Sequence, residues 1–340
     1  MGVLRDVNEE ASVPWRAAAV NAVLPRTQSR YARAFSLFSE WCWSEFGVLP
    51  SSEWPARLMD ELGAQFLGDL SEDFAGGMKS VGANLASGIF QALGFHFRTH
   101  LPTIGRVNKA WALAFPAESH APLPAPWVDL LAVDLARHGC LAMGIGCLVL
   151  FDGFLRISEL CGLTADALLL PEDCRSNRSG SAGLRIPKAK GGADQFAVLS
   201  DEVVMVYLRM LGSYSGVRAA RLFPFSPADF NRALGKACQR LDLPLFTSHS
   251  FRHGAAANAA LHGVDPETIR RRGRWSTQHA MDVYLQQVRS RLLLMETPAW
   301  LSPYLPRLPV WRTVLFDLAA ASSTSPSRGQ SGSGGLVWSR

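Results

Sequence analysis

Several polar side chains in the second half of the sequence are poorly suited to simple packing and could together bind a phosphate. Arg156, in GFLRISEL, directly follows the most apolar part of the chain, where an arginine is costly to bury unless it meets an anion. In HSFRHG, His249 and Arg252 are three residues apart and would share one face of a helix. Lys188 and Lys190 lie near the turn of a predicted β-hairpin.

A tyrosine completes this set of side chains. The segment GRWSTQHAMDVYL, residues 273–285, contains Trp275 and also Tyr284, which is one of only five tyrosines in the chain. An ordinary tyrosine hydroxyl titrates near pH 10, so holding one ionised at pH 7 costs roughly 4 kcal/mol unless cations lie nearby. The combination predicts attack of a tyrosine hydroxyl on a phosphodiester. Arginines would bind the nonbridging oxygens, a histidine would take or give a proton, and a lysine would protonate the departing oxygen.

Each of these residues also has an ordinary structural interpretation. Tyr284 and Trp275 could be core aromatics, Arg156 could pair with Glu159, and the run RRRGR at 270–274 could be a solvated helix end with Gly273 as its C-cap. The remaining histidines, His120 among them, are expected to be structural or surface residues.

A metal site is not expected, although two histidines stand four residues apart. The metalloprotease pattern needs a glutamate directly after the first histidine, and Ser250 follows His249 instead. We also see no carboxylate cluster that would hold a metal, and we expect no cofactor.

The order of these residues resembles the tyrosine recombinase (phage integrase) family over roughly residues 25–295. GFLRISEL is similar to its first-arginine motif, HSFRHG to its His-x-x-Arg motif with a second histidine, and GRWSTQHAMDVYL to its closing motif. In that closing motif a His or Trp precedes the nucleophile by nine residues, as Trp275 precedes Tyr284. Each motif alone is weak, but five features in order at plausible spacing form a specific pattern: Arg156, Lys190, His249-x-x-Arg252, Trp275 and Tyr284.

The resemblance implies a role for each residue and a reaction without ATP. Tyr284 would form a 3′-phosphotyrosyl link to DNA and release a 5′ hydroxyl, which keeps the bond energy in the covalent intermediate. The other implied catalytic residues are Arg156 and Arg252 on the phosphate, His249 and Trp275 on either side of it, and Lys190 as general acid, with Lys188 as the alternative. Glu159 would orient Arg156, and His253 would make supporting hydrogen bonds. Further contacts to the DNA backbone are expected from Arg270, Arg271, Arg272, Arg274 and Lys188.

Hydrophobic periodicity predicts a mostly helical protein with a small β-sheet. Helices are expected at 27–47, 56–70, 78–99, 105–114, 127–150, 156–166, 201–212, 227–241, 250–262, 266–272 and 277–295. Two apolar runs, 184–187 and 196–199, surround a Gly-Gly pair and predict the hairpin.

Proline and glycine content suggests how the chain divides into domains. Residues 116–126 form a proline-rich linker, and the Ser/Gly-rich stretch 319–335 is expected to be disordered. The predicted order is an N-terminal extension (1–25), a helical DNA-clamp domain (26–115), the linker, a catalytic domain (127–300) and a partly disordered tail (301–340). The resemblance implies that the first domain is a SAM-like bundle and that the two domains form a C-shaped clamp around duplex DNA.

Composition favours a folded protein and agrees with a polyanionic partner. Hydrophobic residues make up 48% of the chain and charged residues 19%, with net charge +5. The positive excess lies in the second half, where residues 121–300 hold 20 Lys and Arg against 16 Asp and Glu, while 1–120 hold 10 against 12. Six scattered cysteines without a C-x-x-C pair are consistent with a reducing compartment, and the longest apolar run, 140–151, predicts a buried helix rather than a membrane span.

The leading functional hypothesis is therefore a site-specific DNA recombinase or integrase that acts inside the cell, with four protomers on two double-stranded DNA sites. A type IB topoisomerase would use the same nucleophile without pairing two sites. A domesticated DNA-binding protein that no longer cuts is the third possibility, and the intact set of polar residues argues against it.

Overall fold

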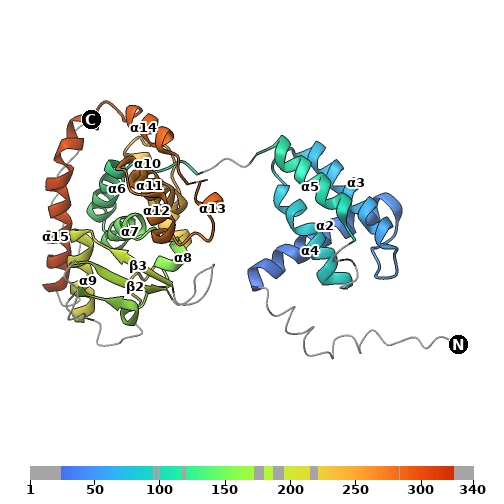
Figure 1. Ribbon diagram of the computed structural model, residues 1–340, viewed down its shortest axis with the longest axis horizontal. Coiled ribbons are helices and arrows are strands. Elements are labelled where there is room, and N and C mark those ends of the chain that lie inside the picture. Colours follow the sequence, from blue (N-terminus) through green and yellow to red (C-terminus); the bar gives the residue numbers. More distant parts are fainter. Residues whose placement is uncertain are drawn as a thin grey trace. The chain divides into compact units, whose positions relative to one another are not determined.

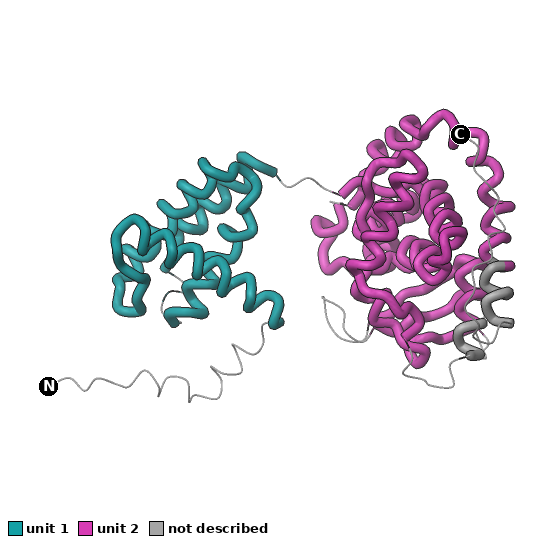
Figure 2. Tube along the Cα trace, turned by 180° about the vertical axis from the view of Figure 1, so that it is seen from behind, with its two compact units in different colours: residues 1–118 teal, residues 119–340 magenta. Residues whose placement is uncertain are grey.

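The computed structural model describes residues 24–94, 97, 100–116, 120–171, 180–186, 195–214, 221–282 and 284–324 of the chain. The chain divides into two compact units, residues 1–118 and 119–340 (Figure 2). Each unit has its own hydrophobic core, and each is described by itself.

The regular secondary structure in the described part of unit 1 is entirely helical. Its main helices are α2 (Pro25–Phe46), α3 (Ala56–Phe74), α4 (Lys79–Leu93) and α5 (Pro102–Ala114) (Figure 1). Helices α2 and α4 approach closely because residue 88 is a glycine, and a Cβ there would lie 2.6 Å from the carbonyl oxygen of Tyr31. The buried carboxylate of Asp60 accepts hydrogen bonds from the N–H groups of Thr103 and Ile104, which satisfies the first turn of α5.

Unit 2 combines many helices with a small antiparallel sheet. Its first elements are α6 (Ala125–Arg137), α7 (Leu141–Asp152) and the one-turn α8 (Ile157–Leu160), followed by a 3-10 turn at Ala165–Ala167. The strands β1 (Leu168–Leu169), β2 (Ala182–Ile186) and β3 (Gln195–Leu199) lie in that order in the sheet. The later elements are α9 (Glu202–Tyr214), α10 (Pro227–Arg240), α11 (Ser248–Leu261), α12 (Pro266–Arg272), α13 (Gln278–Asp282), α14 (Gln287–Met295), a 3-10 turn at Ser302–Arg307 and α15 (Leu308–Thr324).

The core of unit 2 is built around α7. This helix buries seven consecutive residues, 144–150, which confirms the buried helix predicted for 140–151. The predicted helix 127–150 is instead two helices, because the chain turns at Gly139 with φ 77°. Gly144 then allows α7 to pack directly on α6, since a Cβ there would lie 2.4 Å from the carbonyl oxygen of Ala132.

The predicted hairpin is confirmed as β2 and β3. The two strands pair antiparallel from Ala182 opposite Leu199 to Ile186 opposite Gln195. Their side chains alternate between core and solvent, as expected for a sheet with one buried face. The loop that carries Lys188 and Lys190 lies outside the described residues.

Two predicted helices are much shorter than expected. In the segment 156–166 only α8 is α-helical, because the chain turns away after Cys161. The segment 277–295 is interrupted around Tyr284, which lies between α13 and α14. The interruption removes Tyr284 from a regular amphipathic helix.

Part of the expected C-terminal tail is an ordered helix. In Figure 1, α15 runs along one side of unit 2, and it packs against α6 and α9. Leu308 and Leu315 are buried in the core, and Arg312 forms ion pairs with Asp129 and Asp201. The helix α15 extends through residues 319–324, which differs from the disorder expected for this stretch. Residues 325–340 lie outside the described part.

Candidate active site

Arg156 and Arg274 meet at one buried carboxylate, that of Glu159. Nη1 of Arg156 lies 2.7 Å from Oε1 of Glu159, and Nη2 of Arg274 lies 2.7 Å from Oε2 of the same residue. The side chain of Glu159 is only 2% exposed. Arg156 is also the N-cap of α8, and its main-chain N–H donates to Glu159 Oε2 at 2.9 Å. The short helix α8 therefore fixes the positions of Arg156 and Glu159 relative to each other.

The charges of this trio determine the ionisation of its carboxyl group. Burial alone would raise the pKa of Glu159, but the charge of Arg274 and the hydrogen bonds from Arg156 outweigh burial and lower the pKa. One carboxylate thus neutralises one of two arginines. The predicted role of Glu159 as an orienting residue remains a prediction, and the geometry agrees with it.

Arg252 lies on α11 and is completely buried. Its terminal nitrogens donate to the main-chain carbonyls of Phe154 and Gly273, and its Cζ atom lies 4.5 Å from the ring centroid of Trp275. Its Nε atom has no hydrogen-bond partner among the described residues. Burial, followed by the charges of Arg156 and Arg274, lowers the pKa of Arg252 to about 10, so it keeps its charge at neutral pH.

The main chain around Arg252 is strained. Phe154 and Arg274 both have positive φ angles, 50° and 57°, although neither is a glycine. Phe154 supplies one of the carbonyls that bind Arg252, and Arg274 directly follows the residue that supplies the other. We infer that the buried guanidinium stabilises these two turns.

Gly273 is needed for packing rather than for a left-handed helix end. Its φ is −75°, whereas a Cβ at this position would lie 1.6 Å from the Trp275 ring. The expected C-cap role is therefore only part of the explanation. The absent side chain lets the indole of Trp275 pack against the main chain beside Arg252.

Tyr284 lies in an aromatic cluster with His253 and Trp275. Its ring centroid is 4.1 Å from that of His253 and 4.8 Å from that of Trp275, and the Arg252 Cζ atom lies 5.7 Å away. Tyr284 is half-buried, so its ring is held by neighbours while part of the side chain remains accessible.

A basic cavity of about 600 Å³ opens beside Tyr284. Positive side chains and aromatic rings make up most of its wall. The residues that line it are Arg156, Gln195, Phe196, Arg270, Arg271, Arg274, Trp275, Ser276, Ala280 and Tyr284. Nε1 of Trp275 is buried and has no hydrogen-bond partner in the described structure. Such a cavity can accept a phosphodiester together with part of the adjoining nucleotides.

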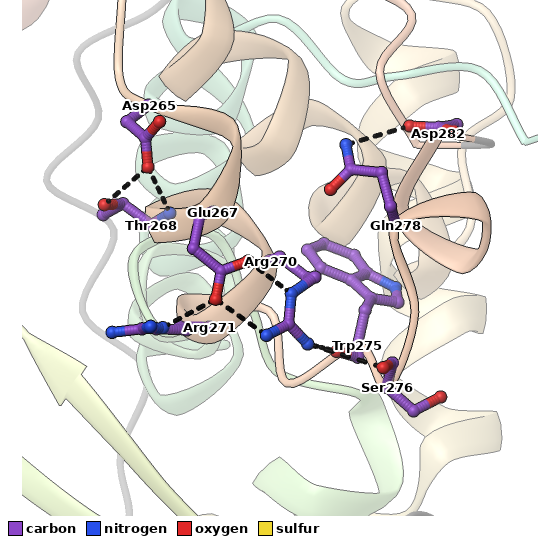
Figure 3. Close-up of polar contacts among 9 residues, drawn as sticks. All are labelled: Asp265, Glu267, Thr268, Arg270, Arg271, Trp275, Ser276, Gln278 and Asp282. Carbon is purple, nitrogen blue, oxygen red and sulfur yellow. Dashed lines mark hydrogen bonds and ion pairs between the residues drawn. The ribbon is translucent and has the colours of Figure 1, made fainter.

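The four arginines that are candidate DNA contacts lie in different surroundings. Arg270 and Arg271 bind Glu267, and Arg270 also donates to the main-chain oxygen of Trp275 at 2.8 Å (Figure 3). Arg274 does not lie at a solvated helix end, because its side chain is 6% exposed and forms an ion pair with Glu159. Arg272 donates to Asp152 and lines a different cavity.

The two histidines of the HSFRHG motif differ in exposure. His249 is exposed in the first turn of α11, whereas His253, one turn later, is 4% exposed. Burial, followed by the charges of His120 and His249, lowers the pKa of His253 to about 4, so it is neutral at pH 7. His253 Nδ1 lies 3.4 Å from Gln286 Nε2, and its supporting role remains a prediction.

Sequence reasoning missed three residues at this site. Gln195 and Phe196 line the cavity from β3, and His120 stacks on His249 with 5.2 Å between ring centroids. Phe196 is an apolar residue on the outward face of a strand, which is the one sequence signal that could have indicated it. Nothing in the sequence connects position 120 with position 249.

The described residues hold no group of three or more His, Cys, Asp or Glu side chains arranged for a metal ion. No helix in the described part of the chain is long and apolar enough to cross a membrane.

Part of unit 2 is similar to a known protein family. Residues 136–291 match the phage integrase family. Comparison of the sequence with curated proteins finds no match.

Three solved structures with a similar fold are described as complexes with DNA. The Tn1549 transposon integrase in complex with transposon right end DNA has 17% identity and a TM-score of 0.52, covering 82% of this chain and 98% of that chain. The XerH site-specific recombinase bound to palindromic difH substrate, a post-cleavage complex, has 13% identity and a TM-score of 0.55, covering 79% and 78%. A lambda integrase dimer bound to a COC′ core site has 13% identity and a TM-score of 0.55, covering 80% and 75%. At these identities the likeness establishes the fold, a mostly helical protein with a small antiparallel sheet. The residues that match the phage integrase family, 136–291, include Arg156, His249, Arg252, Trp275 and Tyr284.

Proposed function

We propose that this protein is a site-specific DNA recombinase that cuts and rejoins DNA through a 3′-phosphotyrosyl intermediate on Tyr284. The observation that carries the proposal is that Tyr284 opens onto the same cavity as Arg156, Arg274 and Trp275. These residues come from segments far apart in the sequence, and simple packing gives no reason for them to converge on a basic cavity.

The charges around the cavity suit the proposed reaction. When the tyrosine oxygen attacks phosphorus, a P–O bond to the tyrosine forms, the P–O bond to the 5′ oxygen breaks, and negative charge builds up on the nonbridging oxygens. Arg156, Arg252 and Arg274 carry three positive charges, and Glu159 removes one, which leaves a surplus of two beside the reacting phosphate. Arg156 and Arg274 line the cavity and would bind the oxygens directly, while the fully buried Arg252 would act from behind Trp275.

Proton transfer completes the reaction. The phenolic proton leaves as the tyrosine oxygen attacks, and His249 is our candidate acceptor. The departing 5′ oxygen gains a proton, for which Lys190 is our candidate donor and Lys188 the alternative. A 5′ hydroxyl from a second strand would then attack the phosphotyrosyl bond and release Tyr284 with its proton.

We include independence from ATP and from metal ions in the proposal. The phosphotyrosyl bond conserves the energy of the phosphodiester, so rejoining needs no further energy source. The clustered arginines would supply the positive charge that metal ions supply in many phosphoryl-transfer enzymes. Double-stranded DNA is the proposed partner, with four protomers on two DNA sites.

A trapping experiment tests the proposal. The protein is incubated with a pool of DNA duplexes that have randomised core sequences and a nick just beyond the position of cleavage. The short 5′-hydroxyl fragment then diffuses away and leaves the covalent adduct, which is detected on a denaturing gel. We expect the adduct with wild type and with Tyr304→Phe, a tyrosine that packs on Trp311. An adduct that persists in Tyr284→Phe would contradict the proposal.

A second assay distinguishes recombination from topoisomerase activity. DNA sites recovered from the adducts are placed on two plasmids, and exchange between them is measured alongside relaxation of supercoils. Exchange supports a recombinase, and relaxation without exchange would identify a type IB topoisomerase instead. Binding without any adduct would identify a DNA-binding protein that no longer cuts.

A further inference from the structure

Residues 120–124 lie directly against α11. They follow the division between the two units and precede α6. The N–H of Leu123 donates to the main-chain oxygen of Ser250 at 3.0 Å, and the side chain of Leu123 is completely buried. At Gly254 an added Cβ would lie 2.0 Å from the carbonyl oxygen of Leu123. This segment, which we call the strap, is therefore fixed on the helix that carries His249, Arg252 and His253.

The strap brings His120 to the beginning of α11. The rings of His120 and His249 are nearly parallel, with 13° between their planes and 5.2 Å between centroids. His120 also meets the ring of His253 edge-on at 5.9 Å. Its Nδ1 atom lies 3.3 Å from Oγ1 of Thr247, the N-cap residue of α11. Two ring contacts and one polar contact thus hold the His120 side chain on this helix.

We propose that His120 is a positioning residue that holds the imidazole of His249 in place for proton transfer at the active site. This inference rests on the proposed function, because it assumes that His249 takes part in the reaction. It assigns a role to a residue that precedes the phage integrase match at 136–291.

The physical reason lies in the exposure of His249. Rotamer changes of an exposed side chain must be restricted before it can act in catalysis, and this restriction costs free energy. The parallel ring of His120 against one face of the His249 imidazole contributes part of that restriction before DNA binds. Misplacement of a catalytic group by about 1 Å can cost about 100-fold in rate, so this restriction affects catalysis directly.

Rescue by an aromatic residue separates positioning from other roles. His120→Phe keeps a flat ring against His249 but loses the polar contact with Thr247, and His120→Ala loses both. His262→Ala is the matched control, because His262 is an exposed histidine at the opposite end of α11. The measurement is the single-turnover rate of adduct formation on a trapping duplex that is fully bound by the protein. We expect His120→Ala to slow this step about 10- to 100-fold, His120→Phe to recover most of the rate, and His262→Ala to match wild type.

A double-mutant comparison tests whether His120 acts through His249. If it does, His120→Ala should slow wild type but cause no further loss in a His249→Ala background. Equal losses in both backgrounds, or a His120→Ala rate equal to wild type, would overturn the inference.

An NMR measurement keeps the inference testable even if the protein forms no adduct. The imidazole Hε1 signal of His249 is assigned from its loss in His249→Ala. Removal of the stacked ring should shift this signal in His120→Ala and leave it in place in His262→Ala. An unchanged His249 signal in His120→Ala overturns the inference by itself, whereas absence of any wild-type adduct overturns the proposed function.

Discussion

The ring of Tyr284 stacks on that of His253, with 4.1 Å between their centroids and 29° between their planes. His253 is buried and neutral at pH 7, because burial and the neighbouring imidazoles lower its pKa to about 4. The candidate nucleophile is thus supported by an uncharged ring, while the positive charge of the site comes from the arginines. The ring that packs on Tyr284 and the positive charges of the site come from different residues, so substitutions can test them separately.

The first prediction concerns the pH dependence that His253 gives to stability. Its pKa is about 4 in the folded protein and about 6.5 when unfolded. Between these values the unfolded state binds more protons, so the contribution of His253 is fully present above pH 6.5 and is lost as the pH falls toward 4. The full loss is on the order of 3 kcal/mol.

Asp129 changes stability with pH in the opposite direction to His253. The effect of His253 must therefore be measured against a variant that lacks this histidine. Burial raises the pKa of Asp129 to about 6 against the opposing charge of Arg312, so the folded state binds the extra proton there. Urea unfolding of wild type and His253→Gln at several pH values removes this shared contribution. We expect wild type to lose stability relative to His253→Gln from pH 6.5 to 4, and parallel curves would contradict the assignment.

The second prediction concerns the carboxylate between Arg156 and Arg274. Glu159→Gln removes the only negative charge in this buried trio and should lower the free energy of unfolding by about 3–5 kcal/mol. Glu267→Gln is the control, because Glu267 pairs with Arg270 and Arg271 at the surface, where solvent screens the interaction (Figure 3). Denaturant unfolding measures both variants. If both variants lose the same free energy of unfolding, the buried carboxylate of Glu159 contributes no more to stability than a surface carboxylate does.

The third prediction separates two arginines that line the same cavity. Arg274 is buried and held by Glu159, whereas the side chain of Arg271 is 76% exposed. We expect Arg274→Ala to slow single-turnover adduct formation by about 100-fold or more, the effect of losing one fixed donor to a developing negative charge. Arg271→Ala should instead weaken DNA binding and reduce its salt dependence. If the two variants behave alike in both assays, the distinction between fixed and solvated arginines fails.

The fourth prediction tests the contact between the strap and α11. Gly254→Ala places a methyl group against the carbonyl oxygen of Leu123 and should lower stability by about 1–3 kcal/mol. Gly235→Ala is a matched control in α10, where an added Cβ meets nothing within 4 Å. Because alanine is the better helix former, Gly235→Ala should raise stability by up to about 1 kcal/mol. Thermal unfolding reports both changes, and the same sign for both would contradict the packing argument.

Much of the secondary structure could be predicted from the sequence, because it follows from local patterns. The buried helix at 140–151 and the β2–β3 hairpin were visible as an apolar run and as two short strands around Gly-Gly. Failures occurred where tertiary contacts decide the outcome. The 277–295 segment looks helical throughout, yet Tyr284 lies in a break, and α15 extends into a region whose composition indicated disorder.

The sequence by itself determined which side chains could form the site. The types and order of Arg156, His249, Arg252, Trp275 and Tyr284 were enough to predict phosphate chemistry and a family resemblance. This was possible because the chemistry constrains residue types and local spacing, which a sequence displays directly.

Only the tertiary structure decided where each of these residues lies and what it contacts. It buried Arg252 against main-chain carbonyls, joined Arg274 to Glu159 across 115 residues, and brought His120 to His249. These outcomes depend on burial and on contacts between distant segments, which local patterns do not specify. The free energy of a charged or aromatic side chain is set by its neighbours in space, and those neighbours exist only once the chain has folded.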